Sequence, residues 1–213
     1  MEEYLDKNVF KIIVVGNSGT GKTSFCNRWI KGTFSETYKA TVMTDFSDKL
    51  YNKNNKEYKI SLWDLAGQDK NIRTTKILTK GALGVLIFCD ITNIKTRNDT
   101  LKWKEAIEES SKFLDTENNI PCFLIENKMD LVKEDIAKDI SSLSEFSNDN
   151  NFCGFYRTSA KTGKNVGKIM DDVIEYILNK LEETTKKETI VEQRDSLFNL
   201  NTKKEEKKKE ECC

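Results

Sequence analysis

The chain has 213 residues, of which 35 are Lys or Arg and 35 are Asp or Glu, so its formal net charge is +0. This balance gives no general attraction to nucleic acid, and we predict no nucleic-acid partner. Because the sequence contains no histidine, a Ser-His-Asp triad, a histidine-ligated zinc and an imidazole general base are all excluded. The length suits one α/β domain with an appendage.

A strand, a glycine-rich turn and a helix are predicted at the start of the chain. Val9–Val15 is mostly apolar and β-branched, typical of a buried parallel strand, and Ser24–Ile30 predicts a helix. Between them, Gly16–Thr23 has the pattern Gly-x-x-x-x-Gly-Lys-Thr, which in this context predicts a loop whose N–H groups surround phosphates. Lys22 can reach the β- and γ-phosphates, and the Thr23 hydroxyl can bind Mg²⁺. The alternative is an ordinary glycine turn before a helix.

Predicted strands and helices alternate along the rest of the chain. Further strands are predicted at residues 45–51, 58–65, 83–89, 122–125 and 155–156, and residues 52–56 have hairpin-turn composition. Apolar residues at helical spacing predict helices over residues 101–113, over residues 166–181, and around Ile136, Ile140, Leu143 and Phe146. Residues 67–80 are polar with a weak helical signal. This alternation predicts an α/β fold with a mostly parallel sheet, helices on both faces and one antiparallel edge hairpin.

The helical pattern ends beyond Leu181. Residues 184–213 are mostly Lys and Glu around a small apolar island at 197–200, a composition typical of disorder. We therefore predict a globular domain at residues 1–182 and a disordered tail at residues 183–213.

Four cysteines lie within the predicted domain, among apolar neighbours: Cys26, Cys89, Cys122 and Cys153. Their surroundings predict buried, reduced thiols rather than a disulfide framework. No apolar run approaches the roughly 20 residues of a membrane span. We expect the chain to be kept in a reducing cytosol.

Two residues after the strand predicted at 58–65 can contact a phosphate and its metal. Asp64 can hold Mg²⁺ through water, and the Gly67 N–H can bond to a γ-phosphate oxygen. Because Asp and Gly are common at strand ends, this pattern alone is a weak signal.

Two further motifs can read a guanine base. Asn-Lys-Met-Asp at 127–130 follows a predicted strand, and the Asp130 carboxylate can accept from guanine N1–H and the 2-amino group. Adenine offers neither donor, a mismatch that can lower affinity by about 10⁴-fold. Thr-Ser-Ala-Lys at 158–161 follows the last strand, and the Ala160 N–H can donate to guanine O6. Each motif alone also fits a polar turn, but their order favours one guanine-nucleotide site and argues against a P-loop nucleotide kinase.

Together these motifs resemble those of the Ras superfamily of small GTPases, and within it the Rab family, over about residues 8–182. The resemblance implies a P-loop GTPase fold with a six-stranded sheet, and a catalyst that hydrolyses GTP to GDP. It implies that Thr41 binds Mg²⁺ and senses the γ-phosphate, that Phe34 packs against guanine, and that Gln68 orients the attacking water. Hydrolysis in the family is slow without an activating protein, which accelerates it up to about 10⁵-fold.

The resemblance assigns three sets of residues. The catalytic set is Gln68, Lys22 and Thr41, and the Mg²⁺ set is Thr23, Thr41 and Asp64. The nucleotide set is Asn17, Ser18, Gly19, Thr20, Gly21, Lys22, Thr23, Ser24, Phe34, Thr41, Gly67, Asn127, Lys128, Asp130, Ser159, Ala160 and Lys161.

Several positions depart from the family pattern. Residues 41–46 match the first switch of the family, the segment that responds to the γ-phosphate, and Met43 replaces a glycine within it. Residues 69–71 differ from the usual Glu-Arg-Phe. Leu78 replaces one aromatic residue of the effector surface, and Glu126 replaces the glycine that usually precedes Asn-Lys-x-Asp. The nucleotide site is thus intact, whereas the effector face is divergent. A nucleotide-binding recruitment module with little or no hydrolysis is the alternative function.

The terminal pair Cys212-Cys213 is similar to the double-cysteine end of Rab proteins, which implies two geranylgeranyl groups. Stable anchoring takes two such signals. The resemblance implies a monomeric switch on the cytoplasmic face of an intracellular membrane, cycling with the cytosol and acting in vesicle or organelle trafficking. The implied partners are an exchange factor, a GTPase-activating protein, GTP-dependent effectors and a prenylation carrier or chaperone of the GDI type.

Overall fold

The computed structural model describes residues 8–37, 39–41, 44–67, 78–110, 112–115 and 118–186. The chain divides into two compact units, Met1–Val173 and Ile174–Cys213. The first unit contains every strand described below, and the described part of the second unit, residues 174–186, is helical.

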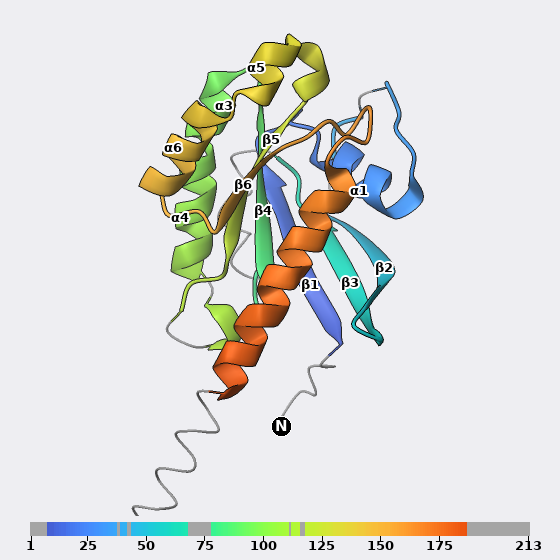
Figure 1. Ribbon diagram of the computed structural model, residues 1–213, viewed down its shortest axis with the longest axis vertical. Helices are drawn as coiled ribbons and strands as arrows, with labels where there is room; N and C mark the ends of the chain where they lie inside the picture. The colour runs from blue at the N-terminus through green and yellow to red at the C-terminus, as the bar shows by residue number, and fades with distance from the viewer. Residues whose placement is uncertain are drawn as a thin grey trace, which may run out of the picture. The chain divides into compact units, whose positions relative to one another are not determined.

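Six strands form one sheet in the order β2-β3-β1-β4-β5-β6 (Figure 1). The strands are β1 (Val9–Gly16), β2 (Asp45–Lys53), β3 (Lys56–Asp64), β4 (Gly84–Asp90), β5 (Cys122–Asn127) and β6 (Gly154–Arg157). Neighbouring strands pair in parallel except β2 and β3, which are antiparallel. At the turn of this hairpin, Asn54 and Asn55 have φ values of 53° and 59°, a conformation that Asn tolerates well. The predicted sheet and its edge hairpin are confirmed.

The helices lie in the connections between strands and after β6. Those that the structure describes in full are α1 (Lys22–Lys31), α3 (Ile94–Asn98), α4 (Thr100–Ser110), α5 (Glu134–Lys138), α6 (Ser141–Asp149) and the helix at residues 166–186, with short 3-10 turns at Phe113–Asp115 and Met129–Leu131. Among the described residues, no helix combines the length and the apolar character needed to cross a bilayer.

Helices cover both faces of the sheet. Trp103 and Ile107 of α4 share a buried cluster with Ile87 of β4. The next residue, Phe88, meets Phe25 of α1 edge-on, with ring centroids 5.1 Å apart. Because successive side chains of a strand point to opposite faces, α4 and α1 lie on opposite sides, as the sequence predicted.

The helix predicted around residues 136–146 is in fact two helices, α5 and α6. The chain leaves the helical conformation at Asp139, whose Oδ1 accepts bonds of 3.0 and 2.7 Å from the N–H and hydroxyl of Ser141. These bonds form an Asx turn between the two helices, so the apolar residues do not lie on one continuous helix face. Ile136 and Ile140 are 51% and 45% exposed, whereas Leu143 is buried.

The last described helix is longer than predicted, because it continues through residue 186 and the expected boundary at residue 182 falls inside it. The hydroxyls of Thr184 and Thr185 each donate to the carbonyl four residues earlier, at 2.9 and 3.0 Å. These bonds give the two hydroxyls partners within their own helix, in a turn that has no apolar pattern. The tail predicted beyond it, residues 187–213, lies outside the described residues.

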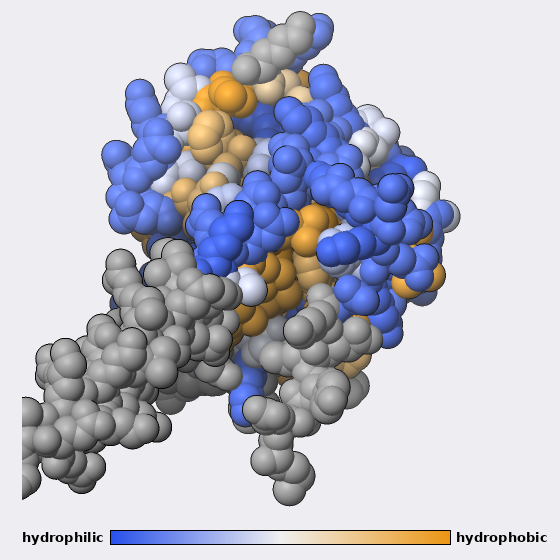
Figure 2. Space-filling model, turned by 60° about the horizontal axis from the view of Figure 1, so that its bottom comes forward, coloured by the Kyte–Doolittle hydropathy of each residue, from blue (hydrophilic) through white to orange (hydrophobic). Residues whose placement is uncertain are grey.

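The cysteine prediction holds at three of the four positions. Cys26, Cys89 and Cys122 are buried and form no disulfide with any described residue. Cys153 likewise forms none with the described residues but is exposed, because it lies in the bend just before β6 rather than in the core. Hydrophilic residues cover most of the face drawn in Figure 2, and apolar residues reach the surface in smaller areas between them.

Candidate functional site

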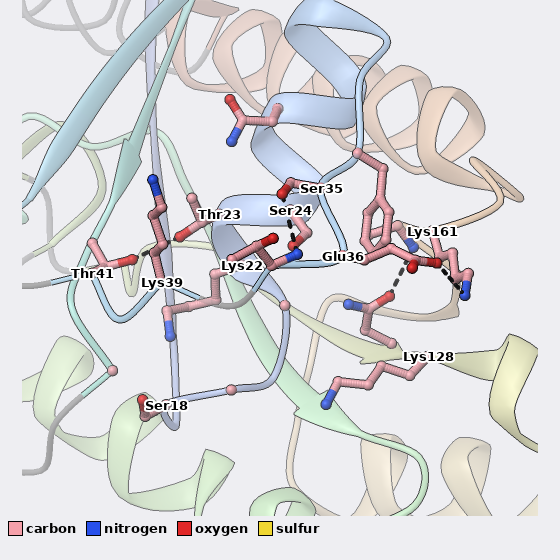
Figure 3. Close-up of a pocket in the computed structure, with 18 of the residues that line it drawn as sticks. Ser18, Lys22, Thr23, Ser24, Ser35, Glu36, Lys39, Thr41, Lys128 and Lys161 are labelled. Carbon is pink, nitrogen blue, oxygen red and sulfur yellow. Dashed lines mark hydrogen bonds and ion pairs between the residues drawn. The ribbon is translucent and has the colours of Figure 1, made fainter.

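A cavity of about 580 Å³ lies where the sequence motifs meet, beyond the carboxyl ends of β1, β3, β5 and β6. Its wall comes from the loop after β1 and the start of α1, from residues 33–41, from Gly67, and from the loops after β5 and β6. In Figure 3, Lys22, Thr23 and Thr41 lie toward one side of this cavity, and Lys128 and Lys161 toward the other. We call these sides the phosphate end and the base end.

The cavity contains all but three of the predicted nucleotide-binding residues. The exceptions are Asn17, Thr20 and Ser159, whose side chains support the wall from behind. Thr20 and Ser159 are fully buried. Sequence reasoning missed several residues that line the cavity, most of them on the polar stretch after α1: Asn27, Thr33, Ser35, Glu36, Thr37, Lys39 and Leu131.

Lys22 supplies a positive charge at the phosphate end. It is the first residue of α1, and its Nζ donates to the Gly16 and Asn17 carbonyls at 2.8 and 3.1 Å. Burial lowers the pKa of Lys22 to about 8, although the Asp64 carboxylate opposes the shift. The amine is therefore still mostly protonated at neutral pH, beside the N–H groups at the helix start, an arrangement that favours phosphate.

Gly67 approaches the phosphate loop so closely that a side chain would not fit. A Cβ at this position would lie 2.5 Å from Lys22 Nζ and 2.6 Å from both the Gly16 oxygen and the Asn17 carbonyl carbon. The segment after β3 therefore reaches the loop only because residue 67 is glycine.

Three side-chain oxygen groups at the phosphate end fit Mg²⁺. Thr23 Oγ donates to Asp64 Oδ2 and lies 2.8 Å from Thr41 Oγ. Asp64 Oδ1 is buried and has no hydrogen-bond partner among the described residues. Burial raises the pKa of Asp64, while the Thr23 hydrogen bond and the Lys22 charge oppose the shift. An unpartnered carboxylate oxygen beside two hydroxyls matches the oxygen ligands that Mg²⁺ prefers, and the bound ion would neutralise phosphate charge.

Asn127 connects the two ends of the cavity. Its Nδ2 donates to the Thr20 carbonyl at 2.9 Å, and its Oδ1 accepts from the Ala160 N–H at 3.0 Å. The Ala160 N–H, predicted to face guanine O6, is thus bonded to Asn127 in this structure. Asn127 is 1% exposed, so its main effect is to hold the loops in position.

The base end presents Asp130 on an exposed turn. Ser159 Oγ donates to Asp130 Oδ1 at 2.5 Å, which fixes the carboxylate between the loops after β5 and β6. Lys128 has φ 68° and pairs with Asp90 Oδ2 at 2.6 Å. Asp90 was not identified from the sequence as a partner of Lys128. The available signal was its position as a carboxylate at the end of β4.

Comparison of the sequence with known proteins shows which family the chain belongs to. A family model described as the Ras family matches residues 11–179. Ras-related protein Rab-32A of Dictyostelium discoideum is 36% identical over 178 residues, covering 83% of this chain and 81% of the relative. The chain is a Rab-family small GTPase.

Other relatives of this Rab-family GTPase are similar to it over comparable lengths. Ras-related protein Rab-7L1 of Rattus norvegicus is 34% identical over 173 residues, covering 81% of this chain and 83% of the relative. Ras-related protein Rab-32 of Homo sapiens is 34% identical over 173 residues, covering 81% and 76%. As a member of the family, the chain binds guanine nucleotide and hydrolyses GTP to GDP.

Two further residues of this Rab-family GTPase hold the loop after β6. Arg28 of α1 donates from Nε to the Ala160 carbonyl at 3.0 Å and from Nη2 to the Lys161 carbonyl at 2.5 Å. Lys161 Nζ pairs with Glu36 at 3.0 Å, and both side chains are largely exposed. Arg28 carries no sequence signal, because its partners lie more than a hundred residues away.

The predicted effector-face and catalytic residues are only partly described. Phe34 is partly buried at the cavity wall. Phe46 and Trp63 pack edge to face with centroids 4.5 Å apart, and Phe46 is 54% exposed. Gln68, like Met43, Cys212 and Cys213, lies outside the described residues.

Proposed function

We propose that this Rab-family GTPase is a membrane-tethered switch whose GTP form recruits effectors in vesicle or organelle trafficking. The observation that supports the proposal best is the contact between Thr41 and Thr23, 2.8 Å apart beside Asp64. Thr41 belongs to the stretch that follows α1, whereas Thr23 lies on α1 itself. A γ-phosphate and its Mg²⁺ would hold this stretch, and hydrolysis would release it.

The switch would turn over slowly without help. Gln68 would orient the attacking water, while Lys22 would stabilise charge on the transferred phosphoryl group. Thr23, Thr41 and Asp64 would hold Mg²⁺, which supplies further positive charge there when bound. A GTPase-activating protein would accelerate the reaction, by up to about 10⁵-fold, and an exchange factor would restore the GTP form.

Attachment to the membrane would depend on the two terminal cysteines. Geranylgeranyl groups on Cys212 and Cys213 would give the two signals that stable anchoring requires. Residues 1–182 would act as the switch and residues 183–213 as its tether on the cytoplasmic face of an intracellular membrane. A GDI-type chaperone would carry the prenylated monomer through the cytosol.

Single-turnover hydrolysis of bound GTP tests the switch. We expect slow release of phosphate from the full chain and a rate at least about tenfold lower for Gln68→Leu. Equal rates near zero would favour a recruitment module without hydrolysis. Mass spectrometry of chain isolated from its own cell tests the tether: we expect lipid on both terminal thiols, and two free thiols in membrane-bound chain would refute it.

A further inference from the structure

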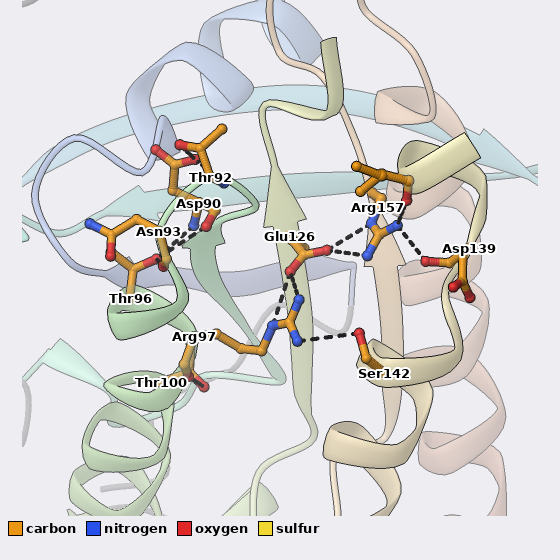
Figure 4. A network of polar contacts seen from close by, with 11 residues as sticks. Asp90, Thr92, Asn93, Thr96, Arg97, Thr100, Glu126, Asp139, Ser142 and Arg157 are labelled. Atoms are coloured by element: carbon orange, nitrogen blue, oxygen red, sulfur yellow. Dashed lines mark hydrogen bonds and ion pairs between the residues drawn. The ribbon is translucent and has the colours of Figure 1, made fainter. Parts of the chain in front are cut away.

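A fully buried carboxylate lies directly behind the base end of the cavity. Glu126, the residue before Asn127, is 0% exposed, and Figure 4 shows it between two arginines. Arg97 binds Oε1 through Nε, at 3.0 Å, and through Nη2. Arg157 binds Oε2 through Nε at 2.7 Å and Nη2 at 2.5 Å. Oε1 therefore accepts two charge-assisted hydrogen bonds, and Oε2 accepts one and makes a further ion-pair contact. Charge-assisted hydrogen bonds are stronger than neutral ones.

The Glu126–Arg157 pair joins two strand ends immediately before the base-reading motifs. Glu126 and Arg157 are partners in the register of β5 and β6. Asn127 follows one of them and Thr158 follows the other. Arg157 also donates from Nη1 to the Asp139 carbonyl at 2.7 Å, at the end of α5. The separation of the two motifs is thus set by a buried ion pair as well as by the sheet.

Arg97 extends this network to the phosphate loop. It lies on α3, and Asp99 at the end of that helix accepts a 2.8 Å bond from Asn17 Nδ2. Trp103 of α4 donates to the same Asn17 side chain at 3.0 Å. A continuous series of contacts therefore runs from the phosphate loop through α3 to Glu126 and the base motifs.

We propose that Glu126 is a positioning residue for guanine recognition, which it controls by holding Arg97 and Arg157. The proposal rests on guanine-nucleotide binding by the chain. Removing the carboxylate charge breaks the ion pair between the ends of β5 and β6 and leaves two neighbouring buried guanidinium groups without their common partner. Arg157, at the end of β6, is then no longer held against β5. The Ser159–Asp130 bond spans the same two loops, so the Asp130 carboxylate loses its fixed approach to the base.

Competition between GDP and inosine diphosphate measures this effect. The inosine base lacks the 2-amino group that Asp130 reads, so the ratio of the two dissociation constants reports the placement of Asp130 rather than overall stability. For the wild-type chain we expect a ratio of about 10 to 100, the range for a hydrogen bond to a charged acceptor. For Glu126→Gln we expect a ratio at least about threefold smaller. Weaker binding of both nucleotides with an unchanged ratio would overturn the proposal.

A matched control and a second variant complete the test. Glu108→Gln removes a carboxylate from the Lys104–Glu108 pair of α4, whose side chains are 11% and 29% exposed, and should leave the ratio unchanged. If Glu126→Gln fails to fold, Arg97→Gln is used, because it leaves Glu126 paired with Arg157; we expect its ratio to fall about twofold. A ratio unchanged in Arg97→Gln would then overturn the proposal. A wild-type chain that binds neither nucleotide would overturn the proposed function as well.

Discussion

The two ends of the cavity are built in different ways. At the phosphate end, consecutive residues supply the loop, and close approach depends on Gly67 lying against Gly16 and Lys22. At the base end, contacts come from side chains on separate strand ends, such as Asn127 with Thr20 and Ala160. The phosphate loop is therefore specified by consecutive residues, although Thr41, Asp64 and Gly67 complete this end from other segments, whereas the base end depends throughout on distant pairs. Changes at the first should affect every nucleotide, and changes at the second should affect the choice of base.

The largest expected effect is the loss of base recognition in Asp130→Ala. Two hydrogen bonds to a charged acceptor are lost, each worth about 1.5–3 kcal/mol, so GDP affinity should fall by about 10²- to 10⁴-fold. Binding of inosine diphosphate should fall less, because this base donates only from N1. Isothermal titration measures both affinities. Equal losses of affinity for GDP and inosine diphosphate would contradict the conclusion that the base end determines the choice of base.

Gly67→Ala should weaken the binding of all nucleotides to the same extent. The added Cβ would displace Lys22 Nζ or the loop backbone, and we expect GDP affinity to fall by roughly 100-fold without a change in the ratio of GDP to inosine diphosphate. Gly81→Ala is the control, because Gly81 lies outside the cavity and a Cβ there meets nothing within 4 Å. Its φ of +72° adds only about 1 kcal/mol of backbone strain. Similar losses in the two variants would contradict the close-approach explanation.

Removal of Mg²⁺ should act through Asp64. Chelation by EDTA should accelerate GDP release from the wild-type chain by about tenfold or more, since the metal neutralises phosphate charge. Asp64→Asn should release GDP quickly with or without EDTA. Fluorescence of a labelled GDP follows both rates. An unchanged response to EDTA in Asp64→Asn would remove Asp64 from the metal site.

The smallest effect is expected for Ser159→Ala. It removes the bond to Asp130 and should lower GDP affinity by about fivefold, corresponding to about 1 kcal/mol. Glu36→Gln breaks the exposed pair with Lys161 and should change the affinity less than about twofold. If Glu36→Gln lowers GDP affinity more than Ser159→Ala does, the Glu36–Lys161 pair at the cavity rim, rather than the Ser159–Asp130 bond, controls how tightly GDP is held.

Local patterns explain how much of the molecule could be predicted from the sequence. The phosphate loop is one contiguous pattern between a strand and a helix, and the Asn54–Asn55 hairpin turn is determined by neighbouring residues. The apolar spacing of residues 136–146 did not indicate that two helices form there, with an Asx turn at Asp139 between them. A short polar side chain that bonds to the nearby backbone can interrupt a helix without changing the spacing of the apolar residues.

Long-range pairs account for what could not be predicted at the site. Glu126 was recognised as a departure from the family, but its partners Arg97 and Arg157 are 29 and 31 residues away. The bonds from Arg28 to the loop after β6 span a still longer separation. Only the fold brings these groups together, so spacing in the sequence carries no information about them.

Titration of the purified, nucleotide-free chain with GDP and with ADP in the presence of Mg²⁺ tests most directly whether the base end reads guanine. We predict that GDP binds tightly and that ADP binds about 10⁴-fold more weakly, because adenine leaves the Asp130 carboxylate unpaired. Equal affinities for the two nucleotides, or no binding of GDP, would contradict guanine recognition by the loops after β5 and β6.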